Sequence, residues 1–302
     1  MTFNQFGYSF PNGGMNESGL VIAVLWDEEA KLPSYTFSTK GVNELQWIQF
    51  HLDKSASVKD VKKNLHLAPA MRVNSKIHYF IADKFGHSAV IEFNQLKNGE
   101  KAQAGITNKT KVDFVSRPEH PFGAITNSKV HSSIGQLKQF KYFGGNKDFP
   151  SNQGIYSKSS IGRFNTLMGE SIELQSMTSV DHREIFDTLD KVHLGAFSKW
   201  RIVYEPNDLT VHFKFHGEEE HSSIHLDDFN LSCQNHGVFL DFRPGMTAKQ
   251  YQASDFKKIN HSTNLDYMKP VFVKFKNATG KSFPVSEITR ISKESIENAH
   301  CQ

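Results

Sequence analysis

The stretch Gly13-Gly-Met-Asn-Glu-Ser-Gly-Leu-Val-Ile-Ala-Val-Leu-Trp26 joins a glycine-rich turn to the longest uninterrupted apolar run in the first half of the chain. Residues 20–26 carry no charge and include β-branched side chains. That composition favours a strand buried on both faces over a helix of the same length. The glycines supply the freedom in φ that a tight turn into such a strand requires. We therefore expect a central strand here, with the rest of the chain packed against it.

Length and charge narrow the class of protein. The 302 residues can bury a sizeable core, and no Pro/Gly/Ser-rich linker divides them, so we expect a single domain over residues 1–302. The formal charge is only +3, with basic residues scattered along the sequence, which argues against nucleic acid as a partner. No apolar run approaches the roughly 18 residues that span a bilayer, so we expect no membrane partner. The first residues carry no export signal, and the sequence does not predict the cellular compartment.

The remaining pattern mixes helices with runs of strands. Helical spacing or capping signals predict helices near 43–54, 58–65, 132–140, 159–168 and 180–194, with Ser57 as the cap of the second and Ser132 or Ser133 as the cap of the third. Apolar alternation and turn signals predict strands at 76–82, 88–93, 200–204, 209–215, 222–226 and 271–275, with a hairpin turn at 206–208. The stretch 94–111 is polar and predicts a loop or further hairpin. This order favours an α+β fold with two packed sheets and helices outside, a four-layer αββα sandwich.

Four stretches occur in the order expected for one enzyme family. They are Asn12-Gly-Gly-Met-Asn-Glu-Ser-Gly-Leu20, the hairpin Ile77-His-Tyr-Phe-Ile-Ala-Asp83 with Ser88-Ala-Val-Ile-Glu-Phe93, Gly123-Ala-Ile-Thr-Asn-Ser128, and Ser159-Ser-Ile-Gly-Arg-Phe164. Together they resemble the choloylglycine hydrolase family, which contains bile-salt hydrolases and penicillin V acylases. The resemblance implies the N-terminal nucleophile hydrolase fold, an αββα sandwich. It also implies hydrolysis of a linear amide C–N bond in a small N-acyl amide, without a cofactor or metal.

In that family the nucleophile is a cysteine at the mature N-terminus, whose own α-amino group is the base. A free α-amine titrates at about 7.7–8.0, close to where such a base must operate. The thiolate attacks the amide carbonyl and forms an acyl-enzyme that water then hydrolyses. This sequence begins with Met1, and its two cysteines are Cys233 and Cys301. The early arginine and aspartate of the family have no counterpart either.

We therefore expect a chain that is truncated at the N-terminus relative to the family and inactive by itself. An internal start in the gene model is the first explanation, and a decayed homologue is the second. Loss of an interior strand would leave a sheet edge open, which predicts self-association or a homo-oligomer. Two alternatives stay open: a non-catalytic pseudoenzyme or acyl-amide-binding scaffold, and an unrelated α+β binding domain.

Three residues carry the implied site. By resemblance, the side-chain amide of Asn127 and the backbone N–H of Trp26 bind the oxyanion of the tetrahedral intermediate. Arg163 would lie beside the nucleophile, where a fixed positive charge favours a thiolate. Without the family, Asn127 is a turn or cap residue, Arg163 an ion-pair residue and Trp26 a core or pocket-wall residue. Bile-salt hydrolases have asparagine in place of Trp26, which argues against bile salts as the substrate.

A second group of residues is rich in histidine. His212, His216, His221 and His225 surround an acidic run at 218–220. His212 and His216 would share one face of a strand, which makes a metal site conceivable. However, the chain has no HExxH motif and no closely spaced ligand pair, and histidines at a hairpin tip are commonly solvated. The sequence therefore predicts no metal site.

Overall fold

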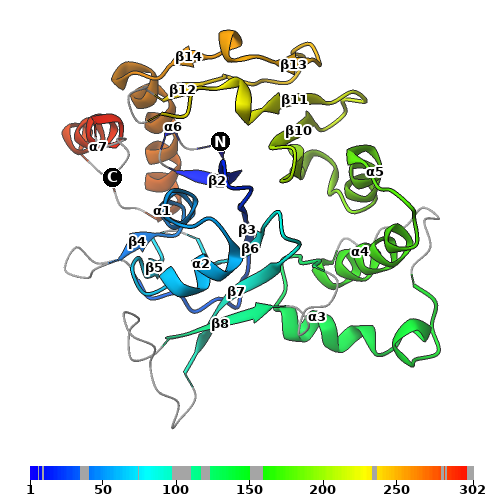
Figure 1. Cartoon of the computed structure of the whole chain (residues 1–302). Coiled ribbons are helices and arrows are strands. Elements are labelled where there is room, and N and C mark those ends of the chain that lie inside the picture. Colours follow the sequence, from blue (N-terminus) through cyan, green and yellow to red (C-terminus); the bar gives the residue numbers. More distant parts are fainter. Residues whose placement is uncertain are drawn as a thin grey trace.

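In the computed structural model, the chain forms an α+β fold with two main β-sheets (Figure 1). Cys233, Cys301 and most of the predicted loop at 94–111 lie outside the described residues. The structure describes residues 1–5, 7, 8, 10–34, 41–73, 75–96, 110–116, 123–149, 159–232, 237–279, 282 and 284–297.

The first sheet is antiparallel and contains the predicted central strand. Its order is β1-β2-β3-β6-β7-β8. The prediction at 20–26 is confirmed as β3, which lies between β2 and β6. Only the start of β3 is buried on both faces, as predicted. The exposure of its side chains increases along the strand to Trp26, which is 45% exposed. The strands are β1 (Thr2–Asn4), β2 (Pro11–Met15), β3 (Val21–Trp26), β6 (Ile77–Ala82), β7 (Ser88–Gln95) and β8 (Thr110–Ser116).

Two helices cover one face of this sheet (Figure 1). Helix α1 (Gln46–Lys54) starts later than predicted, because Asn43 belongs to β4 (Val42–Asn43), which pairs with β5 (Ala70–Met71). Helix α2 (Val58–Asn64) has the predicted cap, since the Ser57 hydroxyl accepts the Asp60 N–H at 3.2 Å. The helices and the sheet share one apolar core that includes Trp47, Ile48, Val61, Ile22, Ile77, Tyr79, Ile81 and Ile91.

The second sheet has the order β13-β11-β10-β9, and the predicted hairpin is confirmed as its β9 and β10. Its strands are β9 (Trp200–Glu205), β10 (Thr210–Phe215), β11 (Ser222–His225) and β13 (Gln250–Tyr251). The two sheets meet through a second apolar cluster, in which Met15 and Val21 of the first sheet join Val211 and Leu226. Because side chains alternate along β10, His212 and Lys214 point to the opposite face.

Helices α3, α4 and α5 follow the first sheet in the chain (Figure 1). Helix α5 (His182–Lys191) lies against the face of the second sheet that carries Lys214, whose Nζ lies 5.0 Å from the centroid of the Phe186 ring of α5. Helix α4 (Ser160–Gln175) packs on α3 (Val130–Leu137) through Phe164 and Leu137.

Three predicted elements differ from the structure. Residues 123–127, which resemble a strand-end motif, form no strand. Helix α3 begins at Val130, ahead of the predicted serine caps, because the Glu92 carboxylate accepts the Val130 N–H. Residues 271–275, predicted as a strand, lie inside α6 (His261–Thr279), which packs on α7 (Val285–Glu297).

A two-stranded sheet of β12 (Val238–Phe239) and β14 (Lys257–Lys258) precedes α6. None of the described helices has the length and apolar character needed to cross a bilayer.

Candidate active site

The predicted site residues Asn127 and Arg163 lie in direct contact, although they are 36 positions apart in the sequence. Arg163 is in the first turn of α4, where the Ser159 hydroxyl accepts the Gly162 N–H at 3.1 Å. Its side chain is largely buried, whereas Asn127 is exposed in the loop before α3. The Arg163 Nη2 donates to Asn127 Oδ1 at 2.6 Å. Since this bond occupies the amide oxygen, the Nδ2 group of Asn127 is the part that can donate to a ligand.

The charge on Arg163 is held in a partly desolvated place. Burial lowers the pKa of the Arg163 guanidinium from its ordinary value. A guanidinium nevertheless stays protonated at neutral pH, so the contact with Asn127 is a charge-assisted hydrogen bond. It polarises the Asn127 amide and strengthens its Nδ2 as a donor.

Trp26 stands at the end of β3, and its side chain and backbone face different surroundings. Its side chain lies on the same face as Ile77, with which it pairs, and the indole Nε1 donates to Glu28. The next residue, Asp27, donates its N–H to Lys76 O at 2.9 Å. Because hydrogen-bonded pairs alternate along an antiparallel ladder, the Trp26 N–H points away from β6. That N–H is therefore outside the ladder between β3 and β6.

A buried charged group, which we call the lysine cluster, connects β3 to the loop that carries Asn127. It consists of Asp27, His78, Glu92 and Lys129, all buried. The Lys129 Nζ lies 2.8 Å from Asp27 Oδ2 and donates to the backbone oxygen of Phe93 at 3.1 Å. The His78 Nδ1 lies 3.5 Å from Glu92 Oε1. Asp27, His78 and Glu92 have the residue types of a metal site, but Lys129 supplies the cation.

The lysine cluster fixes both ends of the Asn127 loop. The His78 Nε2 donates to Thr126 O at 2.8 Å, and the Glu92 carboxylate accepts the Val130 N–H at 2.8 Å. Sequence analysis missed this cluster. A signal was present, because His78 and Glu92 interrupt otherwise apolar strands, and Asp27 directly follows Trp26.

The predicted histidine group is only partly assembled. His212 and His221 come together, but with His182 of α5, which sequence analysis did not single out. His216 instead contacts the ring of His193, with centroids 5.3 Å apart. The sequence signal for His182 is the Asp181 cap, which places His182 at the start of α5.

Comparisons with known proteins agree on the class of this fold. The chain superimposes on penicillin V acylase from Agrobacterium tumefaciens with a TM-score of 0.65 and 19% identity, covering 83% of this chain and 78% of the other. A variant of the conjugated bile acid hydrolase from Clostridium perfringens gives a TM-score of 0.58 and 18% identity, covering 86% and 82%. The fold is therefore the α+β fold of these acylases and hydrolases.

Sequence comparison finds similarity to one family in the first part of the chain. Residues 2–146 match the family of linear amide C-N hydrolases, choloylglycine hydrolase family. Penicillin V acylase from Pectobacterium atrosepticum is 28% identical over 230 residues, which covers 69% of this chain and 60% of that relative. Over residues 2–146, the chain is therefore similar to the choloylglycine hydrolase family of linear amide C-N hydrolases.

Proposed function

We propose that this protein acts on the linear amide C–N bond of a small N-acyl amide, and that Asn127 and Trp26 bind the carbonyl oxygen. The observation that carries the proposal is the hydrogen bond from Arg163 to Asn127 Oδ1 at 2.6 Å. It leaves the Asn127 Nδ2 as a donor at an exposed position. Similarity to this family supports the reaction class.

The proposed chemistry assigns each group one role. As a nucleophile attacks the amide carbon, negative charge develops on the carbonyl oxygen, and the Asn127 Nδ2 and Trp26 N–H stabilise it. Arg163 holds the Asn127 amide in orientation and adds positive charge beside the reacting centre. The family resemblance implies a cysteine nucleophile activated by its own α-amine. The two cysteines of this chain, Cys233 and Cys301, lie outside the described residues.

We also propose an aryl- or alkyl-acyl amide, such as penicillin V, as the substrate class. Penicillin V acylases are among the relatives in sequence and in fold. The aromatic Trp26 at the end of β3, where bile-salt hydrolases have asparagine, supports that class over conjugated bile salts.

For the architecture, we propose that residues 1–302 form one domain of the four-layer αββα type. The contact between the two sheets through Met15, Val21 and Val211 supports this layering. Helices α1 and α2 on one side and α5 on the other would be its outer layers.

The test is hydrolysis of penicillin V by the protein expressed from the full reading frame, including any codons upstream of Met1. Asn127→Ala should lower kcat by about 10²- to 10³-fold, as loss of one oxyanion donor does. Arg163→Lys should lower it less, because the charge stays while the planar contact to Asn127 is lost. Asn146→Ala, at an exposed asparagine beyond α3, is the matched control. An Asn127→Ala protein that is folded and fully active would overturn the proposed role.

A second candidate is a non-catalytic protein that binds an acyl amide without cleaving it. The two candidates separate in the same experiment. Saturable binding of penicillin V without turnover, weakened by Asn127→Ala, supports the binding protein.

A further inference from the structure

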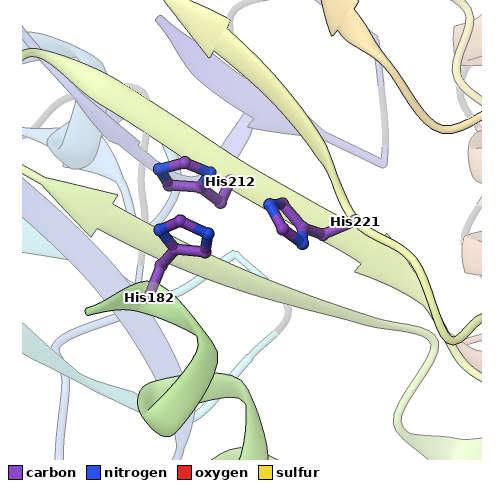
Figure 2. Close-up of side chains that lie close together, drawn as sticks. All are labelled: His182, His212 and His221. Atoms are coloured by element: carbon purple, nitrogen blue, oxygen red, sulfur yellow. The ribbon is translucent and has the colours of Figure 1, made fainter. Parts of the chain in front are cut away.

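Three histidines from three elements converge on the outer face of the second sheet. His182 starts α5, His212 is in the middle of β10, and His221 immediately precedes β11 (Figure 2). One potential ligand atom of each lies within 4.8 Å of the others. We call these residues the histidine cluster. The rings of His182 and His212 stack with centroids 3.9 Å apart, and the ring of His221 is 4.6 Å from that of His182.

The least exposed member of the cluster has no well-formed hydrogen bond. His212 is only 7% exposed, and among the described residues neither of its ring nitrogens has a hydrogen-bond partner. A buried polar group without a hydrogen bond costs roughly 1–3 kcal/mol, so native structures rarely leave one in place without a reason. A cation that accepts the lone pair of a His212 ring nitrogen would remove this free-energy cost.

Glu205, at the end of β9, orients two of the rings. Its carboxylate contacts His182 Nδ1 at 3.1 Å and lies 3.4 Å from His212 Nε2. The opposite nitrogens, His182 Nε2 and His212 Nδ1, are then free of this carboxylate. Metal-binding histidines characteristically donate their second ring N–H to a carboxylate, which fixes the ring and raises its basicity.

Metal ligation requires neutral imidazoles, and the charged groups that face the cluster act in both directions. Burial lowers the pKa of His212, and burial together with the charge of His182 lowers the pKa of His221. The side chains of Arg183 and Lys214 also face the cluster and oppose a cation, but the carboxylates of Glu205 and Asp181 act in the other direction. Lys214 is moreover paired with Asp190 at 3.1 Å.

Access from solvent is also present. A cavity of about 520 Å³ opens beside His221 and is lined in addition by Arg183, Lys214, Glu219 and Glu220. An ion could enter along this cavity, and a water molecule there could complete a fourth coordination position.

We propose that His182, His212 and His221 form a binding site for a divalent late transition metal ion of the zinc type. Three imidazoles suit zinc, nickel or copper, whereas calcium and magnesium prefer oxygen ligands. Tetrahedral Zn–N bonds of about 2.0–2.1 Å place ligand nitrogens roughly 3.3 Å apart. Ligand atoms that lie within 4.8 Å of one another must therefore move closer, and the rings must rotate out of their stack, when the ion binds. The ion ties α5 to β10 and β11, independently of the proposed amide chemistry.

The test is calorimetric titration of the full chain with Zn²⁺ at neutral pH. One equivalent should bind with a Kd in the micromolar range or tighter. His182→Ala and His221→Ala should each weaken it at least tenfold, and Glu205→Gln by about 10- to 100-fold. His216→Ala and His225→Ala are matched controls, since both histidines lie outside the cluster, and they should bind zinc normally. Circular dichroism checks that each variant is folded.

Substitution by Co²⁺ identifies the ligands by a second readout. A visible spectrum of tetrahedral nitrogen and oxygen ligation, lost in His221→Ala, supports the site. His221 precedes a strand and is half-buried, so this variant is expected to fold even if a His212 variant does not. The proposal is overturned if zinc does not bind saturably, if the cluster variants bind as tightly as the parent, or if cobalt shows thiolate charge-transfer bands.

Discussion

The lysine cluster and the histidine cluster contain similar residue types, but they differ in how their charges are compensated. In the lysine cluster, the cation is part of the chain, because Lys129 Nζ lies 2.8 Å from the buried carboxylate of Asp27. His78 also has a partner, the carbonyl of Thr126. In the histidine cluster, both nitrogens of His212 lack a hydrogen bond among the described residues, although Glu205 lies nearby.

Proximity of potential ligand atoms therefore does not by itself define a metal site. Asp27, His78 and Glu92 lie as close together as His182, His212 and His221. Proximity alone would rank the two groups equally. A lysine that already neutralises Asp27 makes the first group a structural support for the Asn127 loop. Unused lone pairs make the second group a candidate for an external cation.

The largest effect is expected from removing the internal cation. Lys129→Met leaves Asp27 buried without its counter-charge, which should lower the free energy of unfolding by about 3–5 kcal/mol. Urea denaturation followed by circular dichroism measures this change. The matched control is Lys141→Met, because Lys141 pairs with Asp148 at the exposed surface, where an ion pair contributes at most about 1 kcal/mol.

A double variant sharpens this prediction. Asp27→Asn combined with Lys129→Met removes both charges of this ion pair and should recover part of the lost stability, since residue 27 is then neutral. If Lys129→Met costs no more than Lys141→Met, the lysine cluster is not the internally compensated site described above.

A smaller effect is expected from supplying a cation to the histidine cluster. At a free Zn²⁺ concentration one hundred times its Kd, the free energy of unfolding should rise by about 2.7 kcal/mol. Lys129→Met should show the same increment, because the two clusters belong to different sheets and share no residue. His212→Gln should show none. Equal stabilisation of His212→Gln and the parent would mean that zinc binds elsewhere.

Local patterns in the sequence predicted much of the fold. The run at 20–26 and the hairpin around 206–208 combine apolar alternation with turn residues, and both match the structure. The stretch 271–275 failed, because its β-branched and aromatic residues favour a strand locally. In the structure this stretch is helical and lies inside α6, which packs against α7 and also contains Pro270.

The site was predictable only where a motif carried the information. Asn127 and Arg163 were identified from family motifs, and the structure brings them into contact. The lysine cluster depends on strand register, which places His78 and Glu92 side by side, and on the path of the loop that returns Lys129. The histidine cluster needs the docking of α5 on β10, since His182 and His212 are 30 positions apart. No spacing rule encodes either arrangement.

The smallest expected effect is the pH dependence of the metal-free histidine cluster. Burial lowers the folded-state pKa of His212 and His221, so the unfolded chain binds protons first as the pH falls below about 6.5. Stability is therefore full above that pH and declines on acidification. Because both rings are partly solvated and Glu205, Asp181, Arg183 and Lys214 also face them, we expect only about 1 kcal/mol between pH 7 and 5.5.

Denaturation of the protein in a chelator at a series of pH values measures this decline. His212→Gln should flatten the profile between pH 7 and 5.5, because glutamine does not titrate, whereas His66→Gln, at an exposed histidine, should leave it unchanged. A parent protein that gains stability on acidification would require a folded-state pKa raised above that of the unfolded chain. That result would place the charged form of the rings in the native state, where it would exclude a metal ion.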